Sequence, residues 1–92
     1  LLDRAAQHRD VHTVATKRAD ELAAILYTSG TTGRSKGAML SHGNLLSNAR
    51  TLQAYWDWQP GDVLIHVLPI FHVHGLFVAS HGALLNGTTM LW

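Results

Sequence analysis

The chain has 92 residues, a formal charge of +1, seven histidines and no cysteine. The absence of cysteine excludes disulfides and thiolate zinc sites, and a charge near zero without a long basic run gives no support for nucleic-acid binding. No apolar run approaches the roughly 20 residues that a membrane span requires. At 47% hydrophobic and 14% charged residues, the chain is rich in apolar side chains for its length, so we expect surfaces that other protein covers.

Residues 1–20 are polar and weakly patterned, and we expect them to form a surface connection. Leu1–Arg9 begins as a helical piece, and Val11–Ala15 is expected to form one short strand. The chain starts without Met and stops inside an apolar run at Trp92, so we expect it to be part of a longer protein.

Residues 22–40 form a second region with a different composition. The apolar run Ala23–Thr28 predicts a buried strand. Residues 29–37 contain too much Gly, Ser and Thr for a helix or a regular sheet, and Ala38–Leu40 follows as a short strand.

Residues 41–92 read as helix, strand, helix and strand. Ser41 is expected to cap the first helix, with His42 and Asn44 also serving the cap, and Pro60-Gly61 is expected to end it. The apolar spacing of an amphipathic helix predicts that its core face holds Leu45, Leu46, Ala49, Leu52, Tyr55 and Trp56.

The remaining elements alternate in the same way. Val63–Pro69 predicts a second buried strand, Gly75–Asn86 a second helix closed by Gly87, and Thr88–Trp92 a third strand. Asn86-Gly87-Thr88 fits a glycosylation sequon, but we interpret it as a helix-ending turn. This order of elements is typical of an α/β fold.

The loop between the first two strands carries the strongest chemical signal. Its glycines permit positive φ and close approach of the backbone, and successive N–H groups in such turns form a concavity that suits an anion. Lys36 and Arg34 add positive charge, and Thr28–Gly37 contains no carboxylate. We therefore expect this loop to bind phosphate. The glycines and hydroxyls concerned are Thr28, Ser29, Gly30, Thr31, Thr32, Gly33 and Gly37.

Two other interpretations of the loop need weighing. A standard P-loop is disfavoured, because Ser35 stands where that motif needs Gly, and Lys36 is followed by Gly37 instead of Ser or Thr. A surface loop that binds nothing is also compatible with the composition, since Gly, Ser and Thr are common in ordinary turns.

The full string YTSGTTGRSKG, Tyr27–Gly37, resembles the signature loop of the adenylate-forming superfamily. This superfamily includes acyl- and aryl-CoA synthetases, luciferases and peptide-synthetase adenylation domains. Ser35 departs from the Pro that many members have. Residues 39–45 (MLSHGNL) and 68–76 (LPIFHVHGL) resemble the family's strand-to-helix passage and acyl-pocket segment. The resemblance covers most of 22–92 and implies an α/β fragment of the large N-terminal domain.

The resemblance also implies a reaction. The carboxylate of a small acid attacks the α-phosphorus of ATP, giving acyl-adenylate and pyrophosphate, and coenzyme A then displaces AMP. Lys36 is the expected catalytic cation at the β- and γ-phosphates. Mg²⁺ is expected with the nucleotide, although no acidic ligand lies near the loop. The residues that would wrap the triphosphate are Thr28, Ser29, Gly30, Thr31, Thr32, Gly33 and Lys36.

His72 and His74 are the candidate substrate residues, and His72 is also a catalytic candidate. His72 directly follows a predicted strand, and in relatives the corresponding His lies at the acyl-adenylate pocket; the alternative is a core histidine. His74 would project to the same side and help bind the second carboxylate of malonate. His66 together with these two residues suggests a candidate metal site. The three histidines have no second type of ligand beside them, which disfavours zinc binding.

Within the superfamily, residues 33–42 (GRSKGAMLSH) and 71–76 (FHVHGL) most resemble malonyl- and methylmalonyl-CoA synthetases. A fatty- or aryl-acid CoA ligase, a domain that loads a carrier protein, and a non-catalytic nucleotide-binding module remain alternatives. The expected partner is the rest of the protein, including a C-terminal domain with a catalytic lysine, without which this chain should be inactive. We expect a cytoplasmic protein, or a mitochondrial one if a transit segment lies upstream.

Overall fold

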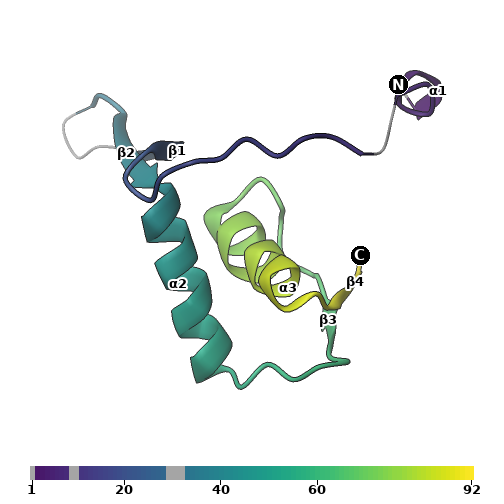
Figure 1. Cartoon of the computed structure of the whole chain (residues 1–92). Coiled ribbons are helices and arrows are strands. Elements are labelled where there is room, and N and C mark those ends of the chain that lie inside the picture. The colour runs from purple at the N-terminus through teal and green to yellow at the C-terminus, as the bar shows by residue number, and fades with distance from the viewer. Residues whose placement is uncertain (1, 9–10, 29–32) are drawn as a thin grey trace.

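The computed structural model describes residues 2–8, 11–28 and 33–92 as a mixed α/β unit. Figure 1 shows the β1–β2 hairpin at the N-terminal end of α2, with α3 beside α2 and with β3 and β4 beyond α3. The elements are α1 (Leu2–Ala5), β1 (Leu22–Thr28), β2 (Lys36–Ser41), α2 (His42–Tyr55), β3 (Val63–Ile65), the π-helical segment η1 (His74–Ser80), α3 (His81–Asn86) and β4 (Thr89–Leu91).

β1 and β2 form an antiparallel hairpin with Tyr27 opposite Gly37 and Ile25 opposite Met39. A Cβ on Gly37 would lie 2.8 Å from Cγ2 of Ile25, so glycine is what allows that side chain to lie over the neighbouring strand. The expected strand is present, but it is not buried: Tyr27 is 76% exposed and Met39 is 70% exposed. Tyr27 and Met39 lie on a face that no described element covers, whereas Leu26 and Leu40 on the other face are half-buried.

α2 begins at a capping box. The backbone N–H of Asn44 donates to Ser41 Oγ (3.1 Å), and the backbone N–H of Ser41 donates to Asn44 Oδ1 (3.0 Å). The predicted cap is therefore confirmed for Ser41 and Asn44. His42 contributes through its backbone, whose N–H donates to the carbonyl of Glu21 at 3.0 Å.

The other end of α2 comes earlier than predicted. The helix ends at Tyr55, before Pro60-Gly61, because Asp57 takes a positive φ of 52° and turns the chain. Asp57 is the one described non-glycine residue with such a φ. The local turn, and not the proline, sets the boundary.

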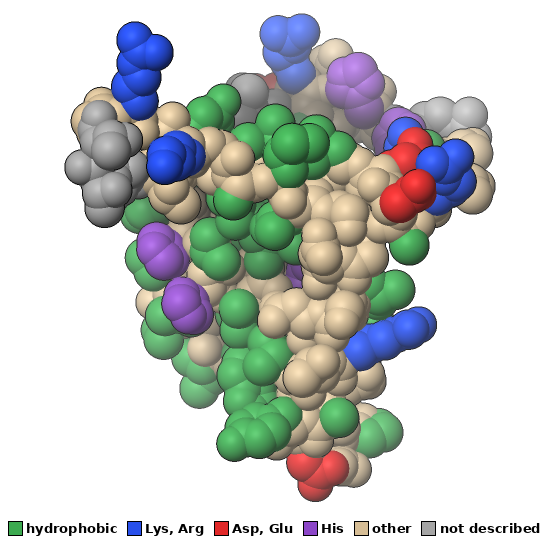
Figure 2. Space-filling view, turned by 90° about the vertical axis from the view of Figure 1, so that its left-hand side faces the viewer, with side chains coloured by type: hydrophobic (Ala, Val, Ile, Leu, Met, Phe, Trp, Pro, Cys, Tyr) green, Lys and Arg blue, Asp and Glu red, His purple; other side chains and the backbone are tan. Residues whose placement is uncertain are grey.

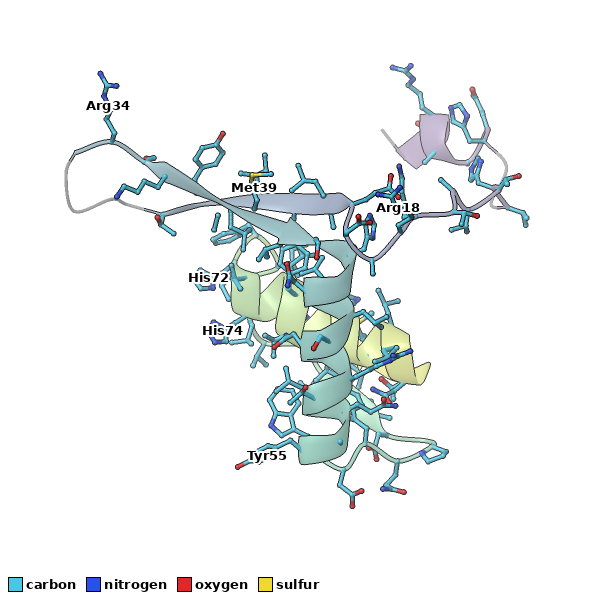
Figure 3. All side chains as sticks on the ribbon, turned by 60° about the vertical axis from the view of Figure 1, so that its left-hand side comes forward. Arg18, Arg34, Met39, Tyr55, His72 and His74 are labelled. Atoms are coloured by element: carbon cyan, nitrogen blue, oxygen red, sulfur yellow. The ribbon has the colours of Figure 1, made fainter. Side chains whose placement is uncertain are left out.

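The predicted core face of α2 is correct only in part. Ala49 is buried, and Leu45 and Leu52 are half-buried against the second helix. Leu46 (42% exposed) and Tyr55 (83% exposed) lie roughly 80–100° around the helix from that stripe, and Tyr55 points outward in Figure 3. Trp56 lies beyond the last turn and is 49% exposed.

β3 and β4 pair in parallel, with Leu64 opposite Met90, and η1 and α3 cross between them. The strand predicted for Val63–Pro69 is observed over Val63–Ile65, where Ile65 pairs with Leu91. The helix–strand turn is confirmed: Gly87 has φ 62°, and the N–H of Thr88 donates to the carbonyl of Ala83 at 3.0 Å.

The N-terminal arm differs from expectation. No strand forms at Val11–Ala15, where Val11 is 74% and Val14 is 88% exposed, and no strand among the described residues pairs with it. Figure 1 shows this arm crossing above α3 to reach α1. Over the described ranges 2–8, 11–28 and 33–92, no helix has the length and apolar character needed to cross a membrane.

Candidate functional site

The hairpin fixes the base of the candidate phosphate loop. Thr28 ends β1, Lys36 begins β2, and the two are register partners. The hydroxyl of Thr28 donates to the backbone carbonyl of Lys36 at 3.3 Å, which ties the two ends of the loop together. Gly33 has a φ of 81° with open space around it, as expected for a glycine in such a loop. Four predicted residues, Ser29, Gly30, Thr31 and Thr32, lie outside the described residues.

The positive charges at this end of the hairpin have no acidic partner among the described residues. Lys36 and Arg34 are exposed, and Figure 3 shows Arg34 at the far end of the hairpin. In the described part of the chain, the side-chain ion pairs lie before β1, at Lys17–Glu21 (3.4 Å) and Arg18–Asp20 (2.9 Å). The hydrogen bond from Arg18 lowers the pKa of the Asp20 carboxyl. An anion at the loop would therefore meet cations that are not already engaged by these carboxylates.

His72 and His74 form a pair. Their rings stack with centroids 5.7 Å apart and planes 13° from parallel, and the backbone N–H of His74 donates weakly to His72 Nδ1 at 3.4 Å. Both residues are exposed, so the described residues do not bury His72 as a core histidine. The expectation that the two side chains project to one side is confirmed.

The placement of His72 along the chain also needs correction. It does not directly follow a strand, since β3 ends at Ile65. It lies in a turn, where its N–H donates to the carbonyl of Pro69 at 3.0 Å, just before η1. The His72 side chain therefore projects from the turn that leads into η1.

The hairpin end and the histidine pair lie on the same side of the molecule. Figure 3 shows His72 and His74 projecting to the side toward which the hairpin and Arg34 extend, and Figure 2 shows histidine side chains on the face below the hairpin. No hydrogen bond or ion pair between described residues joins the two groups.

A cavity of about 290 Å³ opens where β2, α2 and the histidine segment meet. It is mostly apolar, with two asparagines on its α2 side. The sequence did not single out these asparagines as site residues, although their spacing of four places them on one helix face. The lining residues are Leu40, Asn44, Leu45, Asn48, Val73, Phe77 and Val78.

His66, which the sequence suggested only as a metal ligand, is buried next to the helical segment that follows the histidine pair. It is 7% exposed, and its Nε2 lies 2.9 Å from the carbonyl oxygen of Gly75 and 3.1 Å from Ser80 Oγ. The one signal in the sequence was a polar residue inside an apolar run. In the described residues, no group of three His, Cys, Asp or Glu side chains is placed to hold a metal ion.

The comparisons with known proteins agree with this geometry. Residues 2–92 match the family described as AMP-binding enzyme. The mitochondrial malonate–CoA ligase ACSF3 of Mus musculus is 53% identical over 57 residues, which are 62% of this chain and 10% of that protein. ATP-bound MatB from Rhodopseudomonas palustris shares 58% identity with a TM-score of 0.85, covering 99% of this chain and 18% of that chain.

A more distant structure has the same fold. The fatty acyl-adenylate ligase from L. pneumophila, in complex with acyl adenylate and pyrophosphate, is 25% identical with a TM-score of 0.72, over 98% of this chain and 15% of that chain. The chain spans only about a tenth of the length of the curated relatives it matches. The predicted fold, an α/β fragment of the N-terminal domain of adenylate-forming enzymes, is confirmed. Since the family match runs over residues 2–92, the chain belongs to the AMP-binding enzyme family.

Proposed function

We propose that the full-length protein is an ATP-dependent acid–thiol ligase that acts through an acyl-adenylate, with malonate or methylmalonate as its acid. The observation that carries the proposal is that the hairpin, with Arg34 beyond the Thr28–Lys36 pair, extends to the same side as the exposed pair His72 and His74. The names of the relatives, malonate–CoA ligase and CoA ligase, support it.

In this proposal the loop binds the triphosphate. Residues Thr28, Ser29, Gly30, Thr31, Thr32 and Gly33 surround it with backbone N–H groups and hydroxyls, and Lys36 faces the β- and γ-phosphates. Negative charge moves toward the leaving pyrophosphate as the reaction proceeds. Donors already directed at that position stabilise the transition state more than the ground state.

The first step forms a bond between a carboxylate oxygen and the α-phosphorus and breaks the bond from the α-phosphorus to the β-phosphate oxygen. The second step forms a thioester as the sulfur of coenzyme A attacks the acyl carbon, AMP leaves, and the thiol proton passes to solvent. The described residues provide no ligand set for Mg²⁺, so we assign no step here to the metal.

The histidine pair bears on which acid is used. A diacid keeps one free carboxylate after the other is adenylated, and burying that charge without a partner is costly. His72 and His74 offer two imidazoles on one side of the turn, and a protonated imidazole would make a charge-assisted hydrogen bond to it. We therefore assign His72 to the reacting end of the acid and His74 to its free carboxylate.

One observation favours a second candidate. Val73 and Phe77 line the adjacent cavity, which is mostly apolar. An apolar lining suits the tail of a fatty or aryl acid better than a second carboxylate. A fatty- or aryl-acid CoA ligase is therefore the alternative function.

Product analysis tests the proposal. The full-length protein would be incubated with ATP, coenzyme A and either malonate or butyrate, and the products identified by mass spectrometry. We expect AMP and malonyl-CoA, with malonate preferred. Faster use of butyrate would favour the alternative. Adenylate without a CoA thioester would point to a carrier protein as acceptor, and ADP with phosphate would contradict adenylate chemistry.

Cell fractionation would distinguish the two expected locations of the full-length protein, the cytoplasm and the mitochondrion.

A further inference from the structure

His66 is held in place by the parallel sheet. It follows β3 directly, and its backbone N–H donates to the carbonyl of Leu91 at 2.7 Å, which extends the β3–β4 pairing by one residue. Its ring stacks on Trp92, with centroids 4.6 Å apart and planes 24° from parallel. The sheet pairing and the stacking on Trp92 therefore both hold the ring in place from the side of the sheet.

Of the two ring nitrogens of His66, Nε2 faces the backbone of Gly75. Nε2 of His66 lies 2.9 Å from the carbonyl oxygen of Gly75, and the hydroxyl of Ser80 donates to the same oxygen at 3.0 Å. Nε2 also lies 3.1 Å from Ser80 Oγ, and with its proton on Nε2 the ring donates to the Gly75 carbonyl, which can only accept. The other ring nitrogen, Nδ1, is buried and has no partner in the described structure.

An unpartnered buried nitrogen disfavours a role as simple core filling. A leucine would occupy similar space without leaving a polar atom unsatisfied, and such atoms destabilise the folded state. What histidine contributes here, and leucine cannot, is the hydrogen bond to Gly75.

Gly75 is the point through which this hydrogen bond reaches the site. It follows His74 directly and lies at the start of η1. A Cβ on Gly75 would come within 2.1 Å of the carbonyl oxygen of Pro69, so the backbone packs tightly on that side. Gly75, which follows the histidine pair, therefore contacts the Pro69 backbone through its Cα side and the His66 ring through its carbonyl oxygen. A π-helical segment is itself frequent at functional sites.

We propose that His66 is a positioning residue for the acid substrate: through the carbonyl of Gly75 it fixes where His72 and His74 present their rings. The inference rests on the proposed function, because it assigns His66 to the same acid site. The role also predicts that His66 affects the use of the acid and not the use of ATP, since the described hydrogen bonds of its ring are with Gly75 and Ser80 and not with the β1–β2 hairpin.

The test measures the ratio of kcat/KM for malonate to kcat/KM for butyrate, which a purely structural role of His66 would not change. Both values are determined for the full-length protein, with KM for ATP and thermal melting measured in parallel. His66→Leu removes the donor, and His66→Gln keeps an N–H near the position of Nε2. His81→Leu is the matched control, because His81 is a half-buried histidine that contacts Phe77 and not Gly75.

We expect His66→Leu to lower the malonate-to-butyrate ratio of kcat/KM about tenfold, the effect of losing one hydrogen bond, with KM for ATP unchanged. His66→Gln and His81→Leu should keep the ratio within about twofold. If His66→Leu does not fold, Ser80→Ala, which removes the other donor to Gly75, should lower the ratio about threefold.

The outcomes distinguish the positioning role of His66 from the proposed preference for malonate. A protein that prefers malonate, but whose ratio is unchanged by a folded His66→Leu, overturns the positioning role alone. That role is equally overturned if His66→Leu does not fold and Ser80→Ala leaves the ratio unchanged. An unmutated protein that prefers butyrate contradicts the proposed substrate, and the positioning role for a diacid is then lost with it.

Discussion

Lys36→Ala in the full-length protein should weaken the use of ATP far more than it weakens folding. Lys36 is exposed at the first position of β2, and its strand pairing with Thr28 runs through the backbone, which alanine retains. Its ammonium group makes no ion pair among the described residues. Exposed substitutions of this kind usually change the free energy of unfolding by no more than about 0.5 kcal/mol.

The loss of a phosphate contact is larger. A hydrogen bond to a charged group contributes about 1.5–3 kcal/mol, which corresponds to a roughly ten- to hundredfold loss in kcat/KM for ATP. Because pyrophosphate carries more negative charge as it leaves than when bound in ATP, part of this loss should appear in kcat. The expected kinetic effect therefore exceeds the expected stability effect several-fold in free energy.

The assay is acid-dependent pyrophosphate release at limiting ATP, with thermal melting of the same samples. Lys17→Ala is the matched control, because Lys17 is an exposed lysine whose ion pair with Glu21 (3.4 Å) lies before β1. It should leave release within about twofold of the unmutated protein. Unchanged release in Lys36→Ala would remove Lys36 from the site, and a large drop in melting temperature would make it a structural residue.

Four further predictions concern the histidine pair, the η1 backbone, the isolated chain and the ion pair before β1. His74→Ala should reduce kcat/KM for malonate about tenfold and for butyrate much less, and equal losses on both acids would contradict its diacid role. Gly75→Ala should lower the melting temperature, because its Cβ would lie 2.1 Å from the carbonyl oxygen of Pro69; an unchanged melting temperature would mean that this backbone yields easily. The isolated chain should self-associate in sedimentation, since the buried apolar residues of the described structure are only Ala49, Ala79 and Ala83, and a cooperatively melting monomer would refute this. Arg18 lowers the pKa of Asp20 below its usual 3.8, so any stability from this exposed pair is present above that pH and lost as the pH falls through the lowered value. The melting temperatures of the unmutated protein and Asp20→Asn should therefore differ at neutral pH and converge in acid, and a difference that grows in acid would contradict the lowered pKa of Asp20.

Features with local causes were predictable from the sequence. The cap at Ser41 and Asn44 and the turn at Gly87 depend on residues within a few positions, and both are present in the structure. The loop Thr28–Gly37 could be recognised for the same reason, because its donors are contiguous. Its roles in binding remain predictions.

Features that depend on distant partners were not predictable. The extent of the strand Val63–Ile65 is defined by its pairing with β4, and Val11–Ala15 has no partner strand among the described residues. The π-helical form of His74–Ser80 has no distinct sequence period. His66 reaches partners nine and fourteen residues away, so only the fold brings these groups together.

The most direct test of the central claim is isotope exchange between labelled pyrophosphate and ATP, catalysed by the full-length protein without any thiol. Only an enzyme that forms an acyl-adenylate reversibly returns pyrophosphate to ATP in an acid-dependent manner. We predict exchange that requires an acid, is fastest with malonate, and is strongly reduced in Lys36→Ala. Absence of exchange with malonate, butyrate and an aryl acid, in a folded protein that binds ATP, would contradict adenylate formation and leave a nucleotide-binding module without this chemistry.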